Sequence, residues 1–204
     1  MNEKALEIVK QFFNQFCSFA NAKFILNIGP VSPIKNQKLI IESLEKINSS
    51  SPDFFPVFLH LGIMDTDFFY ANETMELIKK LGLEENCYFL GVLDKETTQA
   101  YINLSDVVVI SSVSEGFPLV ISEAFMNKTA LITTNCISNE KILKDNYNCS
   151  IVEKNSTELS VAIIKILQNY EFHSLLIKNA EETSKKYLNL EKNMNYFIKY
   201  LQSI

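Results

Sequence analysis

The 204-residue sequence contains neither tryptophan nor arginine, because all 19 positive residues are lysines, and it has only five glycines, five prolines, four cysteines and two histidines. This composition excludes a collagen-like chain and a disulfide-dense scaffold. No stretch of about 18 apolar residues exists, as a membrane-spanning helix would need. The net charge of -5 excludes the basic face with which proteins hold DNA or RNA, so no nucleic-acid partner is expected.

The cysteines, Cys17, Cys87, Cys136 and Cys149, form no CxxC pair, and neither histidine is grouped with them. This spacing predicts no zinc site. Three of the four lie inside or beside apolar runs, which favours buried thiols in a reducing compartment. The N-terminal segment is too polar for a secretory signal peptide, and a cytoplasmic protein is expected.

Short apolar runs alternate with amphipathic segments along the chain, which is typical of buried parallel strands joined by helices. The expected strands are 23–29, 56–62, 87–91, 106–111, 130–134 and 149–152. The helices expected between them are 36–48, 69–81, 95–104, 118–127 and 138–144, with others at 3–19, 157–169, 172–187 and 190–203. The alternation predicts an α/β fold, a Rossmann-like parallel sheet of about six strands with helices on both faces. Residues 1–22 are assigned to an N-terminal helix and 23–204 to a ligand-binding domain that ends in the helices of 157–204.

Ligands of such sheets bind beyond the carboxyl ends of the strands, and the loop after the fourth run, SSVSEGFPLVISEAFM, is the most informative. Gly116 suits a sharp strand-to-helix turn, and Pro118 is expected at the first helical position. Phe117 would then be the N-cap residue, but its side chain cannot accept a hydrogen bond from the helix amides. The amides of Leu119 and Val120 are left either to water or to an anion, which the helix dipole attracts.

Charged residues near this loop favour an anion over water as the partner of these amides. Glu123 lies on a very apolar helix, where a carboxylate needs a hydrogen-bond partner; sugar hydroxyls are one candidate and a lysine is the other. Glu115 lies at the turn itself. Lys35 is expected in the first turn of a helix capped by Ser32, where a cation is unfavourable unless an anion is bound nearby; a solvated surface lysine is the alternative.

The segment EGFPLVISE resembles the EX7E signature of retaining glycosyltransferases of the GT-B fold, especially glycosyltransferase family 4. Three further blocks are similar to that family in the correct order: FILNIGPVSPIKNQKLIIESL, YFLGVLDKETTQAYINLSDVVVISS and ALITTNCISNEKILKDNYNCSIV. The resemblance covers nearly all of 23–203 and implies the C-terminal, nucleotide-sugar-binding domain of such an enzyme.

The resemblance also implies roles for individual residues. Glu115 would bind hydroxyls of the transferred sugar and Lys35 would neutralise the diphosphate, and these two are the expected catalytic residues. Glu123 would bind the ribose. The other expected donor-binding residues are Gly29, then Val92 and Leu93, which would lie near the base, and Gly116, Phe117, Pro118 and Leu119, whose loop would hold the sugar and distal phosphate. No metal and no cofactor is implied, because the family's chemistry is metal-independent.

The sequence departs from the family at several positions. Pro30 stands where the family usually has an arginine, and a lysine such as Lys38 can supply charge but not a bidentate fork. Family glycines are replaced by Lys128, Ser138 and Cys149, which puts sugar contacts of the Glu140 loop in question. The acceptor-binding N-terminal half is absent, so the chain is either a fragment of a longer enzyme or a short protein that uses a partner subunit.

The leading hypothesis is a retaining transferase that moves a sugar from a UDP- or GDP-sugar to a glycan or lipid-linked acceptor, as in polysaccharide biosynthesis. Its expected location is the cytoplasm, peripheral at the inner face of the membrane. The alternative is a non-catalytic nucleotide-sugar-binding or accessory subunit, which Pro30 and the missing half favour. A dinucleotide-dependent oxidoreductase is disfavoured because no GxGxxG follows the first strand.

Overall fold

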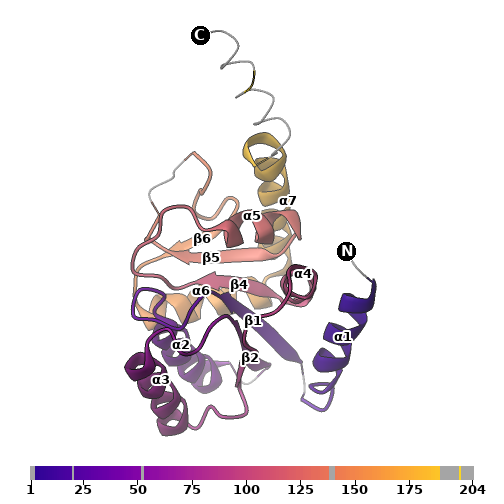
Figure 1. Ribbon diagram of the computed structural model, residues 1–204. Coiled ribbons are helices and arrows are strands. Elements are labelled where there is room, and N and C mark those ends of the chain that lie inside the picture. The colour runs from indigo at the N-terminus through magenta and orange to yellow at the C-terminus, as the bar shows by residue number, and fades with distance from the viewer. Residues whose placement is uncertain (1–2, 20, 52, 138–140, 189–197, 199–204) are drawn as a thin grey trace.

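The computed structural model describes residues 3–19, 21–51, 53–137, 141–188 and 198. Six strands form one parallel sheet in the order β3-β2-β1-β4-β5-β6 (Figure 1). Their bounds are β1 Ala22–Ile28, β2 Phe55–Leu61, β3 Cys87–Phe89, β4 Val107–Ile110, β5 Ala130–Thr134 and β6 Ser150–Val152. This confirms the predicted Rossmann-like sheet, and the strand order reverses between β1 and β4.

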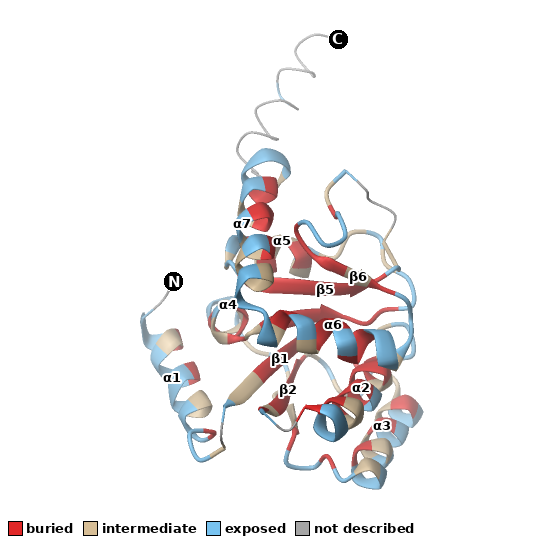
Figure 2. Ribbon diagram, turned by 180° about the vertical axis from the view of Figure 1, so that it is seen from behind, coloured by how far each residue is buried: buried red, intermediate tan, exposed pale blue. Residues whose placement is uncertain are grey.

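Helices cover both faces of the sheet, because each strand directs alternate side chains to opposite sides. The helices are α1 Glu3–Asn14, α2 Gln37–Ser50, α3 Phe68–Leu81, α4 Lys95–Leu104, α5 Leu119–Met126, α6 Ser156–Gln168 and α7 Tyr170–Tyr187. Ile25 of β1 packs in a core with α2, α3 and α6, whereas the adjacent Leu26 packs in a second core with α1, α4 and α5. Strands β2, β4 and β5 are accordingly almost wholly buried (Figure 2), whereas β3 is only partly buried. Helix α7 serves both cores, through Leu176 and Ala180.

Helix α1 is shorter than the helix expected over 3–19. It ends at Asn14 because the chain then tightens into three-residue turns, in which the Gln15 and Phe16 amides donate to the Phe12 and Phe13 carbonyls. These turns return Phe16 to the core, where its ring meets those of Phe12 and Tyr88 at 5.5 and 5.1 Å. The turn therefore buries an aromatic side chain that a continued helix would direct elsewhere.

The helix expected over 138–144 is wrong for its described part, because 141–142 form a turn and 143–144 have no regular structure. The buried Asn148 side chain bonds the Lys144 amide and the Ile142 carbonyl, backbone groups that a helix would use itself. Residues 138–140, and 190–203 apart from Ile198, lie outside the described residues. Cys149 is buried as expected, but Cys17 is exposed. Within the described ranges, no helix is both long and apolar enough to cross a bilayer.

Candidate nucleotide-sugar site

The loops that follow β1 and β4 leave the sheet side by side. The two strands are hydrogen-bonded neighbours, with Ile25 opposite Val107 and Leu26 opposite Val108. The strand order reverses between them, and this is where open α/β sheets bind their ligands. The first loop carries Lys35 and the second carries Glu115, so the fold brings together two residues that are far apart in the sequence.

Glycines allow the backbone to pack tightly at this edge. Gly62 has a φ of 150°, and a Cβ atom on it would lie 1.9 Å from the Gly29 carbonyl oxygen. Gly29 itself has a φ of 145°, and a Cβ there would lie 3.3 Å from Cε of Lys35. The absence of a side chain at Gly29 therefore leaves space for the aliphatic part of Lys35. Gly29 thus affects the site by allowing Lys35 its position.

Lys35 precedes helix α2 and does not lie in its first turn, so the expected cap at Ser32 is wrong. The helix begins at Gln37, and its N-cap, Asn36, has a left-handed backbone that ends a separate turn. Within that turn the Lys35 amide donates to the Ser32 carbonyl at 3.0 Å. Ser111 fixes the turn to β4 by donating to the Lys35 carbonyl at 2.7 Å.

Buried Gln37 holds the preceding part of this loop. Its side-chain amide donates to the Pro30 carbonyl at 3.0 Å and its oxygen accepts from the Ser32 amide at 3.3 Å. Pro30 is thus fixed through its backbone, and it offers no charge where the family usually has arginine.

Lys35 and Glu115 form an ion pair in which Lys35 Nζ lies 2.5 Å from Glu115 Oε1. The side chains are only 24% and 13% exposed, so water screens the interaction little. Ser112 donates to the same Oε1 at 2.6 Å, and its own carbonyl accepts from Thr134 at 2.6 Å. Oε2 of Glu115 has no hydrogen-bond partner among the described residues. Ser112 was not singled out from the sequence, although it directly follows the expected strand 106–111 and therefore lies at the carboxyl end of the sheet, where the polar loops are.

Helix α5 begins without a cap. Its N-cap is Pro118, with an extended ψ of 136°, so the predicted capping position of Phe117 is wrong by one residue. No side chain caps the helix, and the amides of Leu119 and Val120 donate to no acceptor within the described chain. Phe117 is half-buried and anchors the loop in the second core. The predicted uncapped amides are therefore present, one residue later than expected.

Glu123, one turn into α5, is half-buried, and its carboxylate makes no ion pair or hydrogen bond with any residue that the structure describes. Only its backbone carbonyl is engaged, by the amide and side chain of Asn127. The alternative in which a described lysine neutralises Glu123 is excluded.

Lys38 and Lys128, the other two lysines named in the comparison with the family, are engaged elsewhere. Lys38 pairs with Glu73 and lies over the Tyr70 ring at 4.7 Å. Lys128 pairs with Glu181 at 3.4 Å. Lys35 is thus the one lysine that the described structure places against Glu115.

The two residues expected near a base differ from each other. Val92 is 71% exposed, whereas Leu93 is half-buried and packs against the second core. Both follow Gly91, whose carbonyl accepts from the Gly62 amide at 2.9 Å. Ser138 and Glu140 lie outside the described residues.

His60 lies fully buried beneath this edge, near the end of β2, and sequence analysis assigned it no role. Its Nδ1 is 3.0 Å from Asn27 Oδ1, and Nε2 has no hydrogen-bond partner among the described residues. Burial lowers the pKa of His60 to about 4, and the nearby Gly29 backbone opposes this only in part. His60 is therefore neutral at physiological pH and adds no charge to the site.

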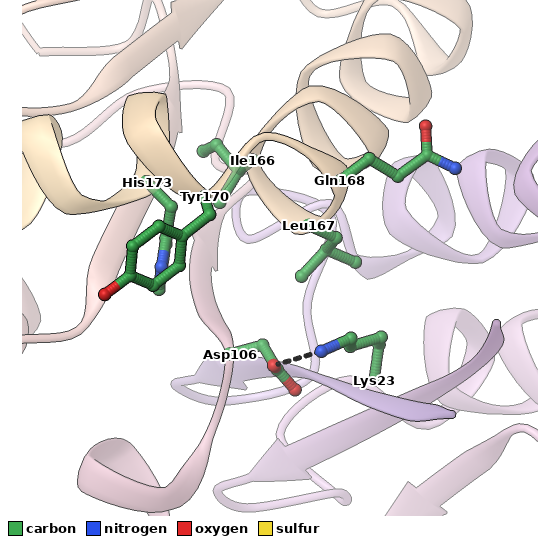
Figure 3. A pocket seen from close by; sticks show the side chains of 7 residues that line it. All are labelled: Lys23, Asp106, Ile166, Leu167, Gln168, Tyr170 and His173. Carbon is green, nitrogen blue, oxygen red and sulfur yellow. Dashed lines mark hydrogen bonds and ion pairs between the residues drawn. The ribbon is translucent and has the colours of Figure 1, made fainter. Parts of the chain in front are cut away.

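A separate pocket of about 280 Å³ lies at the opposite edge of the sheet, where β1 and β4 begin (Figure 3). Lys23 and Asp106 lie side by side on the strand side of this pocket, with Lys23 Nζ 3.2 Å from Asp106 Oδ1. Asp106 also accepts from the Phe24 amide at 2.8 Å. Both oxygens of Asp106 are thus used to join the two strands, and neither is left to accept from a ligand.

Together, the strand order and the polar loops at the reversal point define a doubly wound α/β domain with a candidate ligand site where the strand order reverses. The chain belongs to the family of group 1 glycosyl transferases, whose family model matches residues 9–183. This confirms the broad family expected from the sequence.

A curated relative agrees with this assignment, and solved structures share the fold. An uncharacterized glycosyltransferase of Methanocaldococcus jannaschii is 29% identical over 118 residues, which is 58% of this chain and 27% of that protein. The C-terminal domain of the group 1 family protein LpcC from Francisella tularensis superposes with a TM-score of 0.75 at 22% identity, covering 89% of this chain and 92% of that one. Anabaena HepE, solved in complex with UDP, gives a TM-score of 0.85 at 19% identity, covering 100% of this chain and 54% of HepE.

Proposed function

We propose that this chain is the donor-binding half of a retaining glycosyltransferase that uses a nucleoside-diphosphate sugar. The observation that carries the proposal is the combination of two uncapped α5 amides with the Lys35–Glu115 pair at the point where the strand order reverses. A diphosphate needs donors and positive charge, and a sugar needs hydrogen-bond acceptors. This edge offers both.

The ion pair is compatible with substrate binding without being broken. An ammonium group has three N–H donors, so Lys35 can keep Glu115 and still donate to a phosphate oxygen. Glu115 Oε1 is occupied by Lys35 and Ser112, which leaves Oε2 to accept from a sugar hydroxyl. Glu123, whose carboxylate has no described partner, would accept from the ribose hydroxyls. The EX7E roles of both glutamates thus form part of the proposal.

In the proposed reaction, the bond between the anomeric carbon and the diphosphate oxygen breaks, and the electron pair leaves with the diphosphate. An acceptor hydroxyl then bonds to the same face of the anomeric carbon, and its proton passes to the departing diphosphate. Lys35 and the α5 amides stabilise the charge that develops on the leaving group. No metal or cofactor is required in this scheme.

The loops at this edge also carry exposed apolar side chains, which supports a covering domain. Ile34, Ile63 and Leu119 are 61%, 50% and 76% exposed. The first two lie in the loops after β1 and β2, and Leu119 begins α5. We propose that an N-terminal half or a partner subunit covers this surface and holds a glycan or lipid-linked acceptor, at the inner face of the membrane.

Calorimetric titration with UDP, GDP and their sugar conjugates tests the proposal, and the UDP complex of HepE makes UDP the first choice. Micromolar binding that is lost in Glu123→Ala supports it. Absence of binding by every nucleotide contradicts it. Transfer assays with candidate partner chains then test catalysis. NMR of the product's anomeric configuration tests retention, and activity in the presence of a chelator tests metal independence.

An accessory, non-catalytic subunit is the second candidate, favoured by the single lysine of the site and by the neutral Pro30. Its signature is nucleotide-sugar binding with neither hydrolysis nor transfer, even beside candidate partners. Stimulation of a partner transferase by the bound chain distinguishes it from the leading proposal.

A further inference from the structure

A pocket of about 210 Å³ lies between the segment 141–148 and the last turns of α7, away from the loops of β1 and β4. Three lysines line it: Lys141, Lys144 and Lys186. None of them pairs with a carboxylate that the structure describes, whereas Lys23, Lys35, Lys38, Lys128 and Lys185 all do. One carboxylate, Glu182, is among the lining residues. In a chain of net charge -5 this is a local concentration of positive charge.

The floor of the pocket is fixed. Asn148 is 1% exposed, and its side-chain amide donates to Thr183 of α7 at 2.9 Å and to the Ile142 carbonyl at 2.7 Å. Its oxygen accepts from the Lys144 amide at 2.9 Å. Asn179, also on α7, donates to the Tyr147 carbonyl at 2.8 Å. The lysines therefore extend from a backbone that is already ordered, which lowers the entropic cost of binding a ligand.

Two tyrosines lie beside the ammonium groups. Lys144 lies over the Tyr147 ring at 5.7 Å and Lys186 lies over the Tyr187 ring at 4.9 Å. Lys186, and more weakly Lys144 and Lys141, lower the pKa of the Tyr187 hydroxyl. Lysines from both segments thus lie close enough to one hydroxyl to lower its pKa.

We propose that this pocket binds a phosphate group, carried either by a soluble phosphorylated compound or by an anionic phospholipid headgroup. Lysine ammonium groups bind phosphate as point charges. The volume is about seven times the roughly 30 Å³ that a water molecule occupies in the liquid, so a phosphate and part of its attached group fit. The proposal is independent of the nucleotide-sugar site, because it uses none of its residues.

The test compares the full chain with a variant in which Lys141, Lys144 and Lys186 are all changed to Gln. A control variant carries Lys79→Gln, Lys154→Gln and Lys178→Gln, which remove the same charge from exposed positions elsewhere. A third variant changes the three pocket lysines to Arg. Each protein is titrated with inorganic phosphate and followed by the NMR signals of its lysine Cε groups. Each is also sedimented with vesicles of phosphatidylcholine, with and without phosphatidylglycerol.

Two results support the proposal and identify the source of the phosphate. Saturable binding of inorganic phosphate alone indicates a soluble ligand, whereas sedimentation only with phosphatidylglycerol vesicles indicates a headgroup. In either case affinity falls about tenfold or more in the Gln variant, since each lysine near an anionic surface contributes roughly a fivefold gain. The control and Arg variants keep their affinity. Equal binding by the wild type and the Gln variant, or an equal loss in the control, overturns the proposal.

Discussion

Strands β1 and β4 carry a lysine–carboxylate pair at each end, and the two pairs have different surroundings. At the amino ends, Lys23 and Asp106 lie 3.2 Å apart with side chains 25% and 27% exposed. At the carboxyl ends, Lys35 and Glu115 lie 2.5 Å apart and are 24% and 13% exposed. Strand geometry fixes the first pair, whereas loops fix the second.

The two pairs differ in which hydrogen-bonding groups around them remain unused. Asp106 has one oxygen on Lys23 and the other on the Phe24 amide, so the carboxylate of the amino-end pair has no unused oxygen. Glu115 uses only Oε1, and uncapped helix amides follow it in the same loop. An ion pair therefore indicates a ligand site only where its partners and neighbours keep unused hydrogen-bonding groups. Each prediction below tests this contrast.

Gly62→Ala should have the largest effect, because it disrupts the backbone contact on which the carboxyl edge is built. The new Cβ would lie 1.9 Å from the Gly29 oxygen, and the φ of 150° is one that alanine rarely adopts. We expect a loss of about 3 kcal/mol or more in the free energy of unfolding, measured by urea denaturation. Gly91→Ala is the matched control, because its φ is 72° and nothing lies within 4 Å. It should cost only about 1–2 kcal/mol, and equal losses would contradict the argument.

His60 makes the same edge sensitive to acid. Its pKa is about 4 in the folded chain, against roughly 6.5 when unfolded. Between these values the unfolded chain binds a proton that the folded chain does not, so stability falls as pH drops and levels off near pH 4. From neutral pH to about pH 5 the wild type should lose about 2 kcal/mol more than His60→Gln. Urea denaturation across this range measures the difference, and parallel curves for the two proteins would count against a neutral buried histidine.

Exchanging each lysine for glutamine tests the contrast between the two pairs directly. Lys35→Gln should weaken nucleotide binding about tenfold, because a charged hydrogen bond contributes about 1.5 kcal/mol or more. Lys23→Gln should leave that affinity unchanged and lower the free energy of unfolding by about 0.5–1 kcal/mol, as expected for a partly exposed pair. Calorimetry with UDP and urea denaturation separate the two effects. A binding loss of equal size in both variants would remove the distinction.

Most of the fold could be predicted from the sequence because buried parallel strands require unbroken apolar runs. Val107–Ile110 and Ala130–Thr134 are such runs, and each lies within an expected strand. The error at 141–144 occurs where a side chain replaces regular backbone hydrogen bonds, because Asn148 bonds the Lys144 amide and the Ile142 carbonyl. The left-handed backbone of Asn36 separates the turn of Lys35 from α2, which begins at Gln37. Such local competition depends on tertiary neighbours that periodicity does not reveal.

The residues of the candidate site could be predicted from the sequence, but their contacts with one another could not. Glu115, Glu123 and the uncapped start of α5 follow from the residues of one loop and helix. The pairing of Lys35 with Glu115 does not, because it depends on the adjacency of β1 and β4. Ser112 and His60 were missed for the same reason, since their importance lies in contacts with Glu115 and Gly29.

Ser112→Ala should have the smallest effect, and it should distinguish the affinity for the sugar from the affinity for the nucleotide. Its hydroxyl holds Glu115 Oε1 at 2.6 Å, so its removal leaves the carboxylate with Lys35 alone and less fixed in direction. Affinity for a UDP-sugar should fall about fivefold, or about 1 kcal/mol, while affinity for UDP stays within error. Ser43→Ala removes a buried hydroxyl that bonds the Ile40 carbonyl far from this edge, and it should lower stability without altering either affinity. If Ser112→Ala weakens UDP and UDP-sugar equally, Glu115 acts on the diphosphate side, and its assignment to the sugar is wrong.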